Sequence, residues 1–143
     1  MINQFRVWNK KHRTYRHFTM KDFPIICQTF QAGGMHEFNQ IEQSTGMRDT
    51  NKKEVYPFDF FKRNGETRVV TWLKERASYV TLSLKDHKKY TSEKRSDLDF
   101  LFVDLIDEEI QTKEIIGSVK DPMMKPFLDA KKEVVSELQN TPV

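Results

Sequence analysis

The chain has 143 residues, of which 37% are hydrophobic and 31% charged, and this length suits one folded domain. Five Gly and five Pro exclude collagen-like and proline-rich low-complexity chains, and a single cysteine, Cys27, excludes an internal disulfide framework. No apolar run is long enough to span a membrane, and the first residues lack the layout of a secretion signal. We therefore expect a soluble, cytoplasmic protein that does not contact a membrane.

The charge is divided unevenly along the chain, although its sum is only +3. Residues 1–95 contain 19 Lys and Arg against 10 Asp and Glu, whereas residues 96–143 contain 5 against 11. The basic first part favours a phosphate-rich or acidic partner. The alternative is that the acidic last part folds back on the basic part and neutralises it.

The N-terminal part predicts a β-hairpin followed by an extended segment. Residues 4–8 alternate between apolar and polar, residues 9–11 suit a turn, and residues 14–18 suit a second strand. Residues 23–30 are apolar and β-branched enough for a further extended segment, which a pair of glycines closes. Turn-favouring side chains at residues 48–52 predict a short hairpin.

The middle of the chain predicts successive antiparallel strands. Residues 58–61 and 67–73 flank an Asn-Gly pair, a strong signal for a tight hairpin, and residues 79–84 alternate again. Residues 85–97 are polar and charged, which predicts a solvated loop. Residues 98–106 form the most apolar run of the chain and predict a buried central strand.

The last part predicts a short strand at residues 114–119 and then a helix. A proline inside a helix removes a hydrogen bond and clashes one turn back, so the helix is expected to begin near Pro126. Five apolar side chains then share one broad helix face: Phe127, Leu128, Val134, Val135 and Leu138. Such a face has to be covered, and we expect a second copy of the chain to cover it in a homo-oligomer, docking within one molecule being the alternative.

Together these elements predict a mainly β fold, in which a strongly bent antiparallel sheet closes into a small SH3-like barrel. We expect a single domain over residues 1–143 with three parts. Residues 1–45 hold the N-terminal β-hairpin and extended segment, residues 46–120 the β-barrel core, and residues 121–143 the C-terminal α-helix and tail.

Several stretches resemble one known family. Residues 5–11 read FRVWNKK and resemble the opening FRAWDK of the YopX family of phage and prophage proteins. Residues 43–56, QSTGMRDTNKKEVY, are similar to the family's QYTGLKDKNGKEIY, and this is the more specific match. Residues 69–72 and 114–119 resemble its later GVVxY and EVIGNI elements, so the resemblance spans about residues 5–128.

The resemblance implies a small, mainly β protein encoded by a bacteriophage or an integrated prophage, and it implies no catalytic residues. The chain departs from the family pattern at two motif positions, and residues 85–97 and the helix after Pro126 look like additions to it. Lys52 stands where the family has its turn glycine, and Pro57-Phe58 replace the family's Glu-Gly before Asp59. We therefore expect the local geometry at both places to differ.

The sequence contains no specific pattern for an enzyme or a cofactor site. The histidines are not spaced as zinc ligands, Cys27 lacks the signature of an activated thiol, and no glycine-rich phosphate loop is present. Two carboxylates and a lysine can support a metal-dependent nuclease, and this minor alternative rests on an acidic cluster: Asp97, Asp99, Asp104, Asp107, Glu108 and Glu109. Its spacing is not diagnostic, so we expect no metal, no cofactor and no catalytic residue.

Basic side chains beside aromatic rings are the stronger signal, and they predict a nucleic-acid interface. Lys and Arg neutralise phosphates, while aromatic rings stack on bases. The candidates lie on the predicted hairpin and the predicted loop: Lys10, Lys11, Arg13, Arg16, Lys88, Lys89, Lys94 and Arg95. The simpler interpretation is that Trp8 and Tyr15 pack inward, and that the charges only keep the surface soluble.

We therefore expect a non-catalytic accessory protein that acts by binding in the cytoplasm of a bacterial host. Nucleic acid is the first candidate partner. A host or phage protein, including a defence factor that this chain would inhibit, is the alternative.

Overall fold

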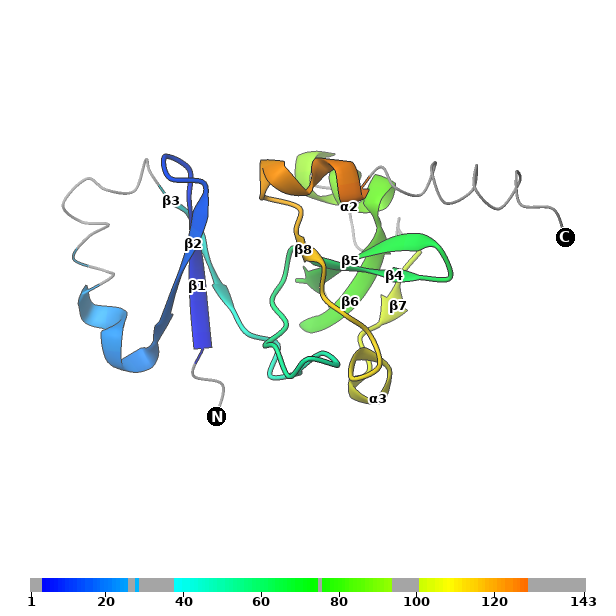
Figure 1. Cartoon of the computed structure of the whole chain (residues 1–143), viewed down its shortest axis with the longest axis horizontal. Helices are drawn as coiled ribbons and strands as arrows, with labels where there is room; N and C mark the ends of the chain where they lie inside the picture. The colour runs from blue at the N-terminus through cyan, green and yellow to red at the C-terminus, as the bar shows by residue number, and fades with distance from the viewer. Residues whose placement is uncertain (1–3, 26–27, 29–37, 75, 94–100, 129–143) are drawn as a thin grey trace, which may run out of the picture.

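The computed structural model describes residues 4–25, 28, 38–74, 76–93 and 101–128, and its strands form two antiparallel sheets (Figure 1). In Figure 1 the two sheets stand side by side, and the loop of residues 44–58 joins them. The predicted mainly β fold is confirmed.

The first sheet has the strand order β2-β1-β3, so β1 lies in its centre. Its strands are β1 (Gln4–Asn9), β2 (Thr14–Thr19) and β3 (Phe38–Gln43). Because alternate residues of a strand point to opposite faces, Phe5 and Val7 pack with Phe18 in one apolar cluster, while Arg6 and Trp8 belong to the other face. The predicted N-terminal hairpin is confirmed, and β1 is buried on both faces.

The extended segment expected over residues 23–30 is wrong in its described part. A 3-10 helix, η1 (Met20–Asp22), follows β2, and residues 23–25 continue as α-helix. Residues 26–27 and 29–37 lie outside the described residues.

The second sheet has the strand order β7-β6-β5-β4-β8. Its strands are β4 (Asp59–Arg63), β5 (Glu66–Leu73), β6 (Ser78–Ser83), β7 (Val103–Asp104) and β8 (Gly117–Ser118). Asn64 and Gly65 connect β4 to β5 with φ of 52° and 79°, as a two-residue turn of the primed type requires. The hairpin and the short strand predicted within residues 114–119 are confirmed.

The two faces of the second sheet carry separate apolar clusters. Leu73, Val80 and Leu82 pack with Tyr90, and Val70 packs with Ile110. Strands β7 and β8 are the two edges of this sheet and do not pair with one another, so the described strands form no closed barrel.

A helix, α2 (Leu84–Glu93), lies where a solvated loop was expected over residues 85–97, and that expectation is wrong for the described part. The hydroxyl of Ser83 accepts a hydrogen bond from the backbone N–H of Asp86 and so caps the helix. Two side chains anchor α2 to the sheet, His87 and Tyr90, which are three residues apart. Because one is polar and the other is aromatic, the sequence shows no aliphatic repeat that would predict a helix here.

The buried central strand expected over residues 98–106 is also wrong in its described part. Only Val103 and Asp104 form a strand, and they pair with β6 alone, at an edge of the sheet. The side chain of Leu101 is 86% exposed, whereas Leu105 is buried. Residues 98–100 lie outside the described residues.

The segment that resembles the YopX pattern forms the loop between the sheets. An isolated bridge between Arg48 and Glu54 confirms a short hairpin around residues 48–52. One carboxylate oxygen of Asp49 accepts from the backbone N–H groups of Asn51 and Lys53, and the other accepts from that of Ile115. Asp49 therefore fixes the loop to a distant segment of the second sheet's core.

The chain after β7 contains two short helices, α3 (Asp107–Ile110) and the 3-10 helix η4 (Pro122–Met124). Residues 125–128 are α-helical, so helix is present at Pro126, where it was expected, and residues 129–143 lie outside the described residues. Within the described ranges, no helix is long and apolar enough to cross a membrane.

Candidate functional site

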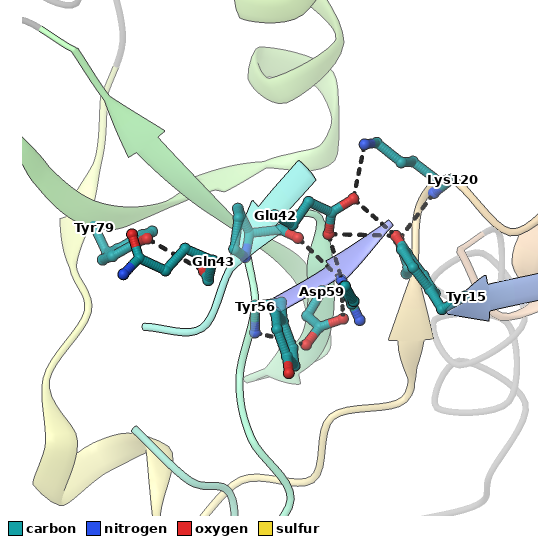
Figure 2. A network of polar contacts seen from close by, with 10 residues as sticks. Tyr15, Glu42, Gln43, Tyr56, Asp59, Tyr79 and Lys120 are labelled. Carbon is teal, nitrogen blue, oxygen red and sulfur yellow. Dashed lines mark hydrogen bonds and ion pairs between the residues drawn. The ribbon is translucent and has the colours of Figure 1, made fainter. Parts of the chain in front are cut away.

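A network of buried charges joins the two sheets (Figure 2). Arg6 Nε lies 2.8 Å from Glu42 Oε1 in β3, and Arg6 Nη2 lies 2.8 Å from Asp59 Oδ1 in β4. The side chains of the three residues are 5%, 2% and 1% exposed, respectively. Because water does not reach these groups, their charges have to be compensated by one another.

Further donors complete the network around Glu42. Lys120 Nζ lies 2.7 Å from Glu42 Oε2, and the Tyr15 hydroxyl donates to the same oxygen over 3.2 Å. The Tyr15 hydroxyl also lies 2.7 Å from Ser118 Oγ in β8. Figure 2 shows these side chains converging from both sheets, so Glu42 is the acceptor through which β1, β2 and the end of the second sheet meet.

Aromatic rings enclose the cations of this network. The Arg6 guanidinium lies 3.9 Å from the ring centroid of Tyr15 and 4.5 Å from that of Tyr56. Trp8 is 5% exposed and packs edge-on against Tyr15. The rings of the predicted hairpin therefore pack inward, and Trp8 and Tyr15 are not available for stacking on bases.

The network shifts the protonation of its own members. Burial raises the pKa of Asp59 to about 6, although the charge of Arg6 acts in the opposite direction. Burial also raises the pKa of Tyr15, and it raises that of Tyr56 to about 12. Both phenols therefore stay protonated at neutral pH, which allows Tyr15 to donate to Glu42.

A cleft of about 590 Å³ opens between β3 and the second sheet, next to this network. Trp72 of β5, Tyr79 of β6, Phe58 and the α2 residue His87 contribute its aromatic rings. Trp72 is 42% exposed, although it belongs to a strand that is otherwise largely buried. The centroids of Trp72 and Tyr79 are 4.8 Å apart in an edge-on contact, so these two rings form one wall.

Polar groups complete the lining of the cleft. The Tyr79 hydroxyl donates to the backbone carbonyl of Gln43 over 3.3 Å and so connects β6 to β3 (Figure 2). Gln43, Lys74 and Thr91 present exposed side chains along the same cleft. Burial and the charge of Lys120 lower the pKa of His87 to about 4, so its imidazole is neutral at neutral pH.

The basic residues predicted on the hairpin lie where they were expected. Lys10, Lys11 and Arg13 lie in the turn between β1 and β2, and Arg16 lies in β2; all four are exposed. Arg13 has a φ of 54°, and the side chain of Asn9 accepts two backbone hydrogen bonds that shape the turn.

The second predicted group of basic residues lies elsewhere on the surface. Lys88 and Lys89 lie on α2 and line a groove of about 500 Å³ that the aromatic cleft does not include. Leu128 of the proposed oligomer interface lines the same groove, and Phe127 is 50% exposed. The remaining predicted residues of the two sets lie outside the described residues: Lys94, Arg95, Val134, Val135 and Leu138.

Two members of the acidic cluster pair with cations in other strands or loops. Asp104 lies 3.6 Å from Arg76, and Glu109 lies 3.0 Å from Arg63, so each has a cation of its own. Among the described residues, no three His, Cys, Asp or Glu side chains are grouped as a metal site would need. Asp97 and Asp99 lie outside the described residues.

Sequence reasoning did not find Glu42, Trp72, Tyr79 or His87 as site residues. Trp72 had no usable signal, because it shares a strand face with Val70, which is 0% exposed, so alternation alone predicts a buried ring. Glu42 had none, since its partners are 36 and 78 residues away in the chain.

No protein-family model matches the chain, and a search of curated proteins found no significant match. The resemblance to the YopX family therefore stays a prediction.

Proposed function

We propose that this protein acts by binding nucleic acid, without catalysing a reaction, through a basic edge. We define the basic edge as the β1–β2 turn, Lys120 and α2. In Figure 1 the turn, α2 and the segment that contains β8 and η4 lie along one edge of the molecule. The aromatic cleft adjoins this edge, because its lining includes His87 and Thr91 of α2.

One observation carries the proposal: the cations of the hairpin, Lys10, Lys11, Arg13 and Arg16, are all exposed, whereas the cations of the buried network are paired with acids. Burial lowers the pKa of Lys120; the charge of Glu42 acts in the opposite direction, and the charges of Arg6 and, least of all, Lys10 lower the pKa further. Exposed cations that lie close together attract phosphates.

The exposure of the turn supports the same proposal. Within the described part of the chain, Lys10, Arg13 and Arg16 make no ion pair, so their charges are not neutralised locally. Lys88 and Lys89 add positive charge on α2, where they line a groove separate from the aromatic cleft. Lys94 and Arg95 follow in sequence and belong to the proposal on that ground alone.

The biological setting is a part of the proposal that rests on the sequence. The resemblance to the YopX family supports an accessory protein of a phage or prophage, located in the cytoplasm of a bacterial host. An SH3-like closure of residues 46–120, a longer C-terminal helix and self-association through it stay predictions.

Salt dependence of binding tests the proposal. Fluorescence anisotropy of labelled single-stranded and duplex 20-mers, from about 50 to 200 mM salt, gives the slope of log affinity against log salt. The double variant Lys10→Ser/Arg13→Asn is expected to flatten that slope by about one for each lost phosphate contact.

The loop of residues 48–54 provides a matched control at the opposite edge of the molecule (Figure 1). Lys52→Asn/Lys53→Ser removes the same charge, and Lys52, like Arg13, has a positive φ, of 62° against 54°. This control is expected to leave the slope unchanged. An equal loss in both variants would show that net charge, and not the basic edge, governs binding.

The same binding experiments also test the other candidate functions. Micromolar protein that shifts no DNA or RNA at about 50 mM salt would overturn the proposal. Capture of a stoichiometric partner from bacterial lysate would then favour the protein-binding alternative. Strand cleavage that depends on Mg²⁺ would overturn the non-catalytic part.

A further inference from the structure

The aromatic cleft contains a large aromatic ring that is not buried in the core. Trp72 is 42% exposed in β5, whereas its neighbours Thr71 and Leu73 are 5% and 0% exposed. Its pairing partner in β6 is Tyr79, whose ring supports it edge-on. Tryptophan stacks well because of its large π surface, and exposing that surface to water is unfavourable. The wall formed by Trp72 and Tyr79 is therefore suited to a planar ligand.

The polar groups around this wall suit a planar ligand with hydrogen-bonding edges. Gln43 has an exposed side-chain amide that makes no hydrogen bond to the described residues, and an amide both donates and accepts. Figure 2 shows Gln43 beside Tyr79, at the end of β3. The cleft volume of about 590 Å³ lies within the range of small-ligand sites. A nucleobase has both the flat face and the donor and acceptor edge that these residues match.

Charge favours a ligand that carries phosphate. Lys74 presents an exposed ammonium group at the cleft, two residues after Trp72. The acid in the lining, Glu42, is 2% exposed and is already paired with Arg6 and Lys120. The cleft therefore offers a ring face, an amide and a cation, with its one acid neutralised.

We propose that this cleft receives an unpaired base of a single nucleic-acid strand, stacked on Trp72 with its edge facing Gln43. The proposal rests on the proposed function, because the phosphates of that strand lie along the basic edge. It adds a preference for single strands, since a base held inside a duplex cannot enter the cleft. It also assigns Trp72 and Gln43 as binding residues.

Tryptophan fluorescence reports on this site directly. The chain has two tryptophans, and Trp8 is 5% exposed, so quenching by a ligand reports on Trp72. The probes are a (dT)20 strand and an abasic 20-mer with the same number of phosphates. Stacking of one base is expected to make (dT)20 bind roughly 5- to 100-fold more tightly than the abasic strand, and to quench Trp72.

Two variants separate stacking from charge. Trp72→Val keeps a strand-forming residue and is expected to abolish the difference between the two strands while leaving the salt slope unchanged. Gln43→Ala is expected to weaken (dT)20 binding without changing abasic binding. Phe127→Ala is the matched control, because this ring is 50% exposed and lies outside the cleft. Circular dichroism and thermal melting confirm that each variant is folded.

The possible outcomes distinguish a failure of this inference from a failure of the proposed function. If (dT)20 and the abasic strand bind equally and Trp72 fluorescence is unchanged, the inference fails and the proposed function stands. If neither strand binds, the proposed function fails and the inference fails with it. If a bacterial protein quenches Trp72 and no strand does, the cleft is a peptide site.

Discussion

Arg6 and Asp59 form a buried ion pair, with Nη2 and Oδ1 2.8 Å apart, that links the central strand of the first sheet to β4 of the second. The apolar cluster of the first sheet is separate from the two clusters of the second. The junction between the sheets therefore depends strongly on buried polar contacts. A fold with a single hydrophobic core would depend on them less. The cleft lies at this junction, so its shape depends on the same contacts.

Replacing Arg6 by Met is expected to lower the free energy of unfolding by about 3 to 5 kcal/mol, because Glu42 and Asp59 would lose their shared cation while still buried. Urea denaturation followed by circular dichroism measures the change. Arg48→Met is the control, because Arg48 is 63% exposed and pairs with Glu54 at the surface. That variant should stay within about 1 kcal/mol of the parent. Similar losses in both variants would show that the buried pair has no special role.

Replacing Asp49 by Asn is expected to cost about 1 to 3 kcal/mol. The amide keeps one acceptor oxygen, whereas the carboxylate of Asp49 accepts from three backbone N–H groups on two segments. Asp121→Asn is the control, because among the described residues the Asp121 carboxylate accepts one hydrogen bond, from the exposed backbone N–H of Met123. Hydrogen exchange at Ile115 should accelerate in the first variant and not in the second. An unchanged rate at Ile115 would contradict the role given to Asp49.

Replacing Lys52 by Gly is expected to stabilise the protein by up to about 1 kcal/mol. Lys52 has a φ of 62°, a left-handed conformation that costs a side-chain-bearing residue roughly 1 to 2 kcal/mol and costs glycine little. The greater freedom of glycine in the unfolded chain offsets part of that gain. Lys53→Gly, one residue on, has no such strain to relieve and should lower the melting temperature. A lower melting temperature for Lys52→Gly would show that the loop is not strained.

Replacing His87 by Gln is expected to remove part of the acid sensitivity of folding. Burial and Lys120 lower the folded pKa of His87 to about 4, from 6.5 for the free side chain. Between these values the unfolded chain binds a proton that the folded chain does not, so stability is complete above about pH 6.5 and falls toward pH 4. Denaturation midpoints measured across this range should fall less in the variant. His12→Gln, in the exposed turn, should behave as the parent does.

The local parts of the fold could be predicted, because their signals lie within a few residues. Asn64-Gly65 specified its turn, and the alternation around Phe5 specified β1. The prediction for the segment after Leu84 was wrong, because its helix is anchored by His87 and Tyr90 and not by a run of aliphatic residues. The prediction for the apolar run around Leu101 was wrong for the opposite reason. Its residues are apolar, but the strand that they form pairs only at an edge of the sheet.

The candidate site could be predicted only where it needs no tertiary contact. The charges of the β1–β2 turn are readable from Lys10 and Arg13, since exposure of a turn follows from its position. The cleft required knowledge that β3 lies opposite Trp72 and Tyr79. Composition and periodicity cannot show that β3 lies close to β5, because the two strands belong to different sheets.

The order of the junction residues along the chain matters during synthesis on the ribosome. The backbone pairing of the first sheet is complete once Gln43 has been made, and N-terminal parts generally leave the ribosome first. Arg6 then has Glu42 as a partner, but Asp59 follows later, and Lys120 comes 78 residues after Glu42. A nascent first sheet therefore exposes to water the face of β1 that carries Arg6, and that face becomes buried only when the second sheet has been made.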